Sequence, residues 1–143
     1  MVYLCCLLIY KRRIGLLASC HGFRADNFTS GTISGNTASE TTGEAFCVNF
    51  LSAGMMSDDT ARDNTQAGFR VRTPFNQSTV TGNTASGIIE DGFQISFGGV
   101  NTGLFNINSS TSNTLKEYNI MGTPVAGGGT NTGSRNEGSN DDF

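Results

Sequence analysis

Short segments of alternating apolar and polar residues recur along this chain at a nearly constant interval. Each begins at an aromatic residue, as in Phe46-Cys47-Val48 and Phe93-Gln94-Ile95. Alternation with a period of two predicts a β-strand with one apolar face. The aromatic residues stand 23 to 25 positions apart and are Phe23, Phe46, Phe69, Phe93 and Tyr118.

A second apolar position and a column of amide side chains follow each aromatic residue. The apolar residues Ile33, Met56, Val80 and Phe105 indicate a second strand in each unit. The column Asn36, Asp59, Asn83 and Asn108 comes next, always ten residues before the following aromatic residue. Extra residues in the longer units fall between the aromatic residue and this column, which predicts a loop there.

Neither strand is long enough to be stable alone, so each unit must bury its apolar face against the next. No unit contains the i, i+3, i+4, i+7 stripe of an amphipathic helix. The sequence therefore predicts an all-β solenoid over residues 21–121, with the aromatic residues stacked in the core. Gly35 and Gly82 are expected at tight turns, and the amide column is expected to form a hydrogen-bonded ladder. Asp59 interrupts that ladder, because an ionised carboxylate cannot donate a hydrogen bond.

The segments GFRV and TVTGNTAS, with their counterparts in other units, resemble the right-handed parallel β-helix of the pectate-lyase-like superfamily. The resemblance implies about four coils of 23–25 residues that are stacked about 4.8 Å apart by parallel strand pairing. Leucine-rich repeats have a similar period, but their leucine signature is absent from the sequence.

The two ends differ from the repeats. The apolar run Val2–Tyr10 is shorter than the roughly 20 residues of a membrane-spanning helix. The basic residues Lys11–Arg13 follow it, whereas a secretory signal has its charges first. We expect residues 1–20 to cap the open end of the solenoid, with a targeting segment as the alternative, since Leu17–Cys20 resembles a bacterial lipobox. Residues 122–143 are rich in Gly, Asn and Ser and are expected to form a flexible tail.

Composition narrows the classes of partner. The formal net charge of −3 and the pI near 4.9 argue against binding to nucleic acid. The four cysteines, Cys5, Cys6, Cys20 and Cys47, lack CxxC spacing, and His21 is the single histidine. This pattern argues against a usual zinc site and predicts buried or free thiols, with a disulfide such as Cys20 to Cys47 left open.

Candidate chemistry falls on two groups of residues. In the polysaccharide lyases and hydrolases of the resembled superfamily, the outer face of the sheet that follows the aromatic column holds the substrate, which makes Arg70, Arg72 and Asp26 the catalytic candidates. Solvated charges on that face would equally well keep a non-enzymatic solenoid soluble. Asp58, Asp59 and Asp63 offer oxygen ligands for calcium, although a solvated acidic turn has the same composition.

The sequence favours a non-enzymatic β-solenoid surface or structural module that binds carbohydrate or another protein. The alternative is a polysaccharide lyase or glycoside hydrolase. No cofactor is expected apart from calcium, and an extracellular or cell-surface location is expected. A short solenoid also exposes two sheet ends, so end-to-end stacking with a second copy is a further alternative.

Overall fold

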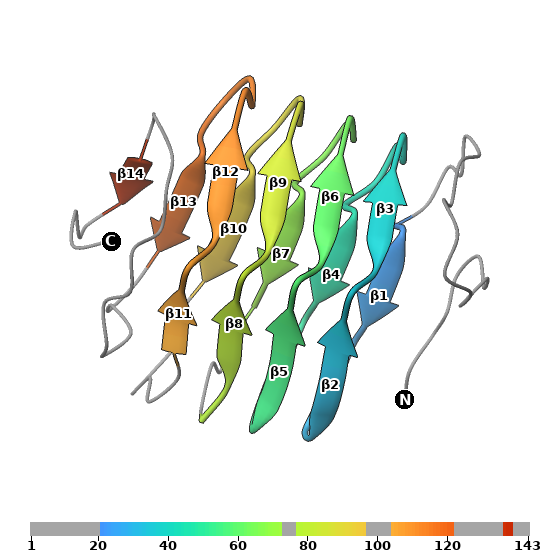
Figure 1. Ribbon diagram of the computed structural model, residues 1–143, viewed down its shortest axis with the longest axis vertical. Helices are drawn as coiled ribbons and strands as arrows, with labels where there is room; N and C mark the ends of the chain where they lie inside the picture. Colours follow the sequence, from blue (N-terminus) through green and yellow to red (C-terminus); the bar gives the residue numbers. More distant parts are fainter. Residues whose placement is uncertain (1–20, 73–76, 97–103, 122–135, 139–143) are drawn as a thin grey trace.

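The computed structural model describes residues 21–72, 77–96, 104–121 and 136–138. Within them the chain winds as a parallel β-solenoid of about four coils, and the predicted all-β fold class is confirmed (Figure 1). These described residues contain no helix, and hence none that could cross a bilayer. The expectations for residues 1–20 and for most of 122–143 lie outside the described part.

Three parallel sheets form the walls of the solenoid. The first sheet contains β1 (Phe23–Ala25), β4 (Phe46–Val48), β7 (Phe69–Val71), β10 (Phe93–Ser96), β13 (Tyr118–Met121) and β14 (Asn136–Gly138). The second contains β2 (Gly31–Ser34), β5 (Gly54–Ser57), β8 (Thr79–Thr81) and β11 (Leu104–Asn106). The third contains β3 (Thr37–Ser39), β6 (Thr60–Arg62), β9 (Thr84–Ser86) and β12 (Ser109–Thr111).

The third sheet and β14 were not predicted from the sequence. The segment Thr84-Ala85-Ser86, which looks like part of a turn, is a strand whose Ala85 side chain is fully buried. The turn before it needs only two residues, Gly82 with φ of 67° and Asn83. β14 lies within the expected tail and pairs with β13. Each coil therefore has three strands. One sharp corner separates the strand of the second sheet from that of the third, and another follows the strand of the third sheet.

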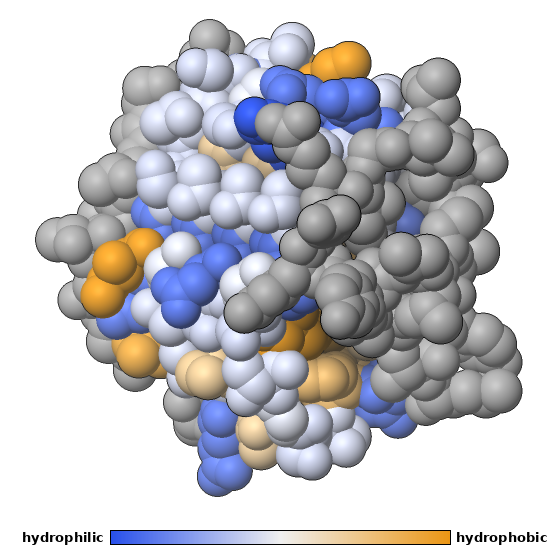
Figure 2. Space-filling model, turned by 45° about the vertical axis from the view of Figure 1, so that its right-hand side comes forward, coloured by the Kyte–Doolittle hydropathy of each residue, from blue (hydrophilic) through white to orange (hydrophobic). Residues whose placement is uncertain are grey.

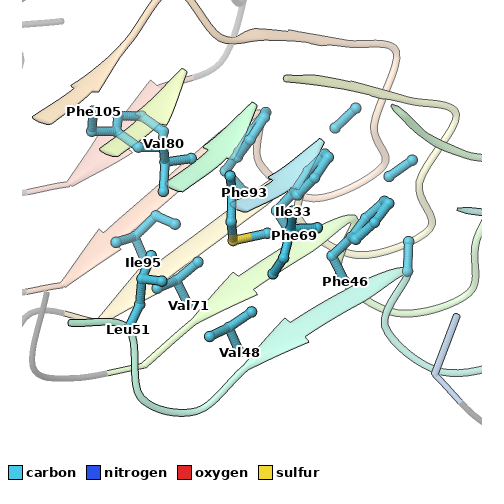
Figure 3. Packing of buried hydrophobic residues seen from close by; sticks show 14 of the residues in the cluster. Ile33, Phe46, Val48, Leu51, Phe69, Val71, Val80, Phe93, Ile95 and Phe105 are labelled. Atoms are coloured by element: carbon cyan, nitrogen blue, oxygen red, sulfur yellow. The ribbon is translucent and has the colours of Figure 1, made fainter. Parts of the chain in front are cut away.

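The core consists of like side chains stacked along the solenoid axis. The rings of Phe46 and Phe69 are 4.8 Å apart and nearly parallel, and Phe69 and Phe93 are 4.7 Å apart. Tyr118 continues this stack, and Phe105 meets it edge-on. Figure 3 shows the aromatic rings beside a second column of aliphatic side chains. That column is Val48, Val71, Ile95 and Ile120.

The third sheet packs closely against the aromatic strands because its inward side chains are small. Ala61 and Ala85 are fully buried and face Gly68. A Cβ at Gly68 would come within 2.7 Å of the Gly92 carbonyl oxygen and 3.1 Å of Ala85 Cβ. Glycine is therefore needed at position 68 for close approach of the chain, and this packing fixes the first sheet relative to the third.

Candidate functional site

The outer face of the first sheet carries most of the candidate chemistry. Parallel pairing places its outward residues in two columns across the coils. One column contains Arg24, Cys47, Arg70, Gln94 and Asn119. The second, two residues later in each coil, contains Asp26, Asn49, Arg72 and Ser96. We call this surface the charged face.

Asp26 is held by two neighbours at one end of the charged face. Arg24 Nε donates to Asp26 Oδ1 at 3.0 Å, and Asn49 Nδ2 donates to the same oxygen at 2.6 Å. The hydrogen bond from Arg24, followed by that from Asn49, lowers the pKa of Asp26. The same ion pair raises the pKa of Arg24. Asp26 is therefore a carboxylate at neutral pH and cannot serve as a general acid.

Glu44 is the buried carboxylate of this region, with only 4% of its side chain exposed. Arg70 NH1 donates to Glu44 Oε1 at 2.5 Å, and His21 Nδ1 contacts Oε2. Burial alone would raise the pKa of Glu44, but the Arg70 hydrogen bond and the charges of His21 and Arg70 together lower it. Arg70 is thus engaged by a carboxylate and is not free to act as a proton acceptor.

Cys47 lies beside Glu44 as a buried free thiol. Its Sγ donates to Asn49 Oδ1 at 3.8 Å. Burial, and after it the negative charge of Glu44, raises the pKa of the Cys47 thiol despite the nearby arginines. The other three cysteines lie outside the described residues. His21, Glu44 and Cys47 each offer a ligand atom, and these atoms lie within 4.8 Å of one another; we call them the His21–Glu44–Cys47 cluster.

Asp91 repeats the position of Glu44 two coils further along the solenoid. Asn119 Nδ2 donates to Asp91 Oδ2 at 2.7 Å, and Gln94 Nε2 lies 3.5 Å from the same oxygen. In both cases an acid two residues before the aromatic column is bound by the outward side chain of the next coil. Glu44 and Asp91 were not predicted from the sequence, although the triplets Glu44-Ala45-Phe46 and Asp91-Gly92-Phe93 carry the signal.

The three catalytic candidates share the charged face but have different partners. Asp26 is bound to Arg24 and Asn49, and Arg70 is bound to Glu44. Arg72 is exposed, and within the described part of the chain no carboxylate contacts it. The structure thus draws Arg70 into contact with Glu44, which was not among the candidates.

The three calcium candidates lie around β6. Asp58 and Asp63 are exposed, each in the left-handed φ region at one of the two corners that flank this strand. Asp59 is fully buried, and its Oδ1 accepts from the backbone N and from Nδ2 of Asn36. Within the described residues, the His, Cys, Asp and Glu side chains close enough to share a metal ion are the His21–Glu44–Cys47 cluster.

The outer side of the third sheet is a second regular surface. Its outward positions flank the buried Ala38, Ala61, Ala85 and Ser110. With the exception of Arg62, all these positions carry hydroxyl groups: Thr37, Ser39, Thr60, Thr84, Ser86, Ser109 and Thr111. Ser39 is buried, and the other six hydroxyl-bearing residues are at least partly exposed. Figure 2 shows rows of side chains of intermediate hydropathy on this side of the molecule. We call it the hydroxyl face.

Comparison of the chain with protein-family models, with curated proteins and with solved structures finds no match. The protein is therefore described by its fold, a parallel β-solenoid with three sheets. The link to the pectate-lyase-like superfamily remains a resemblance of sequence pattern.

Proposed function

We propose that this protein is a non-enzymatic β-solenoid module that binds a neutral polysaccharide along its hydroxyl face. The observation that carries the proposal is the register of Thr37, Thr60, Thr84 and Ser109, which pair directly from coil to coil. Strand pairing spaces such side chains about 4.8 Å apart. A hydroxyl group both donates and accepts hydrogen bonds, so the row matches the hydroxyl groups of an extended sugar chain.

The charged face supports the non-enzymatic part of the proposal. Asp26 and Glu44 are both bound by arginines that lower their pKa values, so neither supplies a proton near neutral pH. Arg70 is held in the same network. A polysaccharide partner fits a location at or outside the cell surface.

Binding is tested by affinity electrophoresis of the full chain in gels that contain soluble neutral polysaccharides. The variant T60V/T84V removes two adjacent hydroxyl groups from the hydroxyl face while keeping the branched shape. Loss of two hydrogen bonds is expected to weaken binding about tenfold or more. The matched control is T79V/T81V, which makes the same change on β8 of the second sheet and is expected to leave retardation unchanged.

Failure of binding and turnover would each overturn the proposal. One is the absence of retardation by every neutral polysaccharide, or equal loss in both double variants. The other is turnover: release of unsaturated uronate that disappears in R70A or R72A would establish a lyase on the charged face.

A further inference from the structure

The His21–Glu44–Cys47 cluster combines residues that are distant in sequence and different in chemistry. The backbone N–H of Gly22 donates to the Glu44 carbonyl, so His21 stands next to Glu44 in the neighbouring coil. Cys47 follows Glu44 by three residues on β4. The pairing of neighbouring coils therefore brings the three residues together: Cys47 lies on β4, and His21 and Glu44 lie just before β1 and β4.

The ligand types match a zinc-class cation. Imidazole nitrogen, carboxylate oxygen and thiolate sulfur are the three donors that Zn²⁺ takes in proteins. Their ligand atoms lie within 4.8 Å of one another, and His21 Nδ1 and Glu44 Oε2 are in contact, so these two side chains must rotate apart to admit an ion. Three protein ligands leave a fourth tetrahedral position open, as in sites that bind water or a ligand.

A second observation concerns the contact between His21 and Glu44. Glu44 Oε2 and His21 Nδ1 are buried and contact each other, and neither atom makes a hydrogen bond to any other described residue. They face each other, and the side chain of Glu44 is only 4% exposed. Buried polar atoms need partners, and a cation bound to both atoms would satisfy them together in place of this single contact.

The surrounding residues are arranged to hold such ligands in place. Arg70 binds Oε1 of Glu44 and so orients the other oxygen, Oε2, toward His21. Arg24 NH1 lies 3.3 Å from His21 Nε2, while its Nε is held by Asp26. The contact of Arg70 with Glu44 is of the kind that fixes the orientation of a metal ligand. When Nδ1 binds a cation, Nε2 carries the ring proton, so Arg24 NH1 must turn away from it.

We propose that His21, Glu44 and Cys47 form a binding site for a zinc-class divalent cation with one open coordination position. Binding releases the thiol proton of Cys47, so affinity rises with pH. The site lies on the charged face and is independent of polysaccharide binding on the hydroxyl face.

The test uses Co²⁺ and Zn²⁺ with the purified full chain. Co²⁺ bound to a thiolate produces a sulfur-to-metal charge-transfer band, which reports Cys47 directly once Cys5, Cys6 and Cys20 are replaced by Ser. We expect one Co²⁺ per chain, the band in this background, and displacement of Co²⁺ by Zn²⁺. Zn²⁺ affinity is measured by competition with a chromophoric chelator.

Single substitutions distinguish the three metal ligands from residues that are not ligands. C47S is expected to remove the band, and H21A and E44Q are expected to weaken Zn²⁺ binding on the order of 100-fold, somewhat beyond the effect of losing an outer contact. D91N is the matched control, because Asp91 occupies the same column two coils away, and it should bind Zn²⁺ normally.

Circular dichroism checks that each variant retains strand structure, and H21A tests the site if E44Q fails to fold. If the triple Ser background fails to fold, comparison of the wild-type chain with C47S decides. The proposal is overturned if the thiolate band is absent, survives C47S, or if H21A leaves Zn²⁺ affinity unchanged.

Discussion

The backbone N–H of Asn36 donates to Asp59 Oδ1 at 2.9 Å, across one coil of the solenoid. The same relationship joins Asp59 to Asn83 and Asn83 to Asn108, so these four residues form one ladder. Asn83 Nδ2 also donates to the Met56 carbonyl. The residue that pairs with Met56 in the preceding coil is Ile33. An ionised Asp59 has no N–H group that could donate to the Ile33 carbonyl in the same way. Asp59 Oδ2 is buried without a partner.

Replacing Asp59 by Asn should therefore stabilise the protein at neutral and alkaline pH. Burial raises the pKa of Asp59 from 3.8 to about 6, and the hydrogen bonds from Asn36 offset only part of this effect. A raised pKa favours the folded state below pH 3.8, and this contribution is lost as pH rises through about 6. At roughly 1.4 kcal/mol per tenfold change in proton affinity, D59N should gain about 2–3 kcal/mol at pH 8.

Urea denaturation of the wild type and D59N at pH 4, 6 and 8 measures this difference. D58N is the control, because Asp58 is the exposed neighbour. The explanation fails if D59N and D58N have the same pH profile.

The ion pair of Arg70 with Glu44 predicts a large loss of stability when only one partner is removed. R70M leaves the Glu44 carboxylate buried with only His21 beside it, at a cost of up to about 3–5 kcal/mol. Because the pKa of Glu44 is lowered on folding, its stabilising contribution is present above pH 4.5 and is lost as pH falls through the lower folded-state pKa.

Thermal unfolding at pH 7 and pH 3 compares R70M with R70M/E44Q. The double variant should recover much of the loss at pH 7, since it buries no unpaired charge. R24M is the control and should have a smaller effect, because the Arg24–Asp26 pair is partly exposed. Equal losses in R24M and R70M would contradict this account.

The repeat was predictable because stacking forces the same residue type into the same position of every coil. The aromatic residue and the column that contains Asn36, Asp59, Asn83 and Asn108 recur in successive coils, and both reveal the period. The third strand was harder to predict because its inward residues, Ala61 and Ala85, are small and give little hydrophobic contrast. Sequence alone could not predict the contact of His21 with Glu44, because it depends on the register of neighbouring coils.

The aromatic stack predicts that the stability lost on removing one ring depends on the position of that ring in the column. Phe69 is fully buried and stacks against rings on both sides, so F69A should cost about 3–5 kcal/mol. Phe23 lies at the first coil and is partly buried, and within the described residues the one aromatic ring it meets is Phe46, at 6.3 Å. F23A should therefore cost clearly less in the same chemical denaturation experiment. A cost for F23A that equals that for F69A would mean that the stack is not the main source of the effect.

Ile107 predicts a stabilising substitution, because its backbone φ is +53° and its side chain is 60% exposed. The left-handed region is costly for a β-branched residue, and the equivalent corners of other coils use Gly35, Asp58 and Gly82, none of which is β-branched. I107G relieves about 1–2 kcal/mol of backbone strain and loses about 0.5–1 kcal/mol through chain entropy. We expect a net gain of about 0.5–1 kcal/mol in the free energy of unfolding.

The matched control for I107G is I89G, because Ile89 is 56% exposed but lies outside the left-handed region. That substitution brings the entropy cost of glycine without relief of strain, so it should destabilise the protein. Urea denaturation of both variants should therefore give changes of opposite sign. If I107G destabilises the protein as much as I89G does, the corner at Ile107 is not strained, and the left-handed corner would accept a branched side chain at no cost.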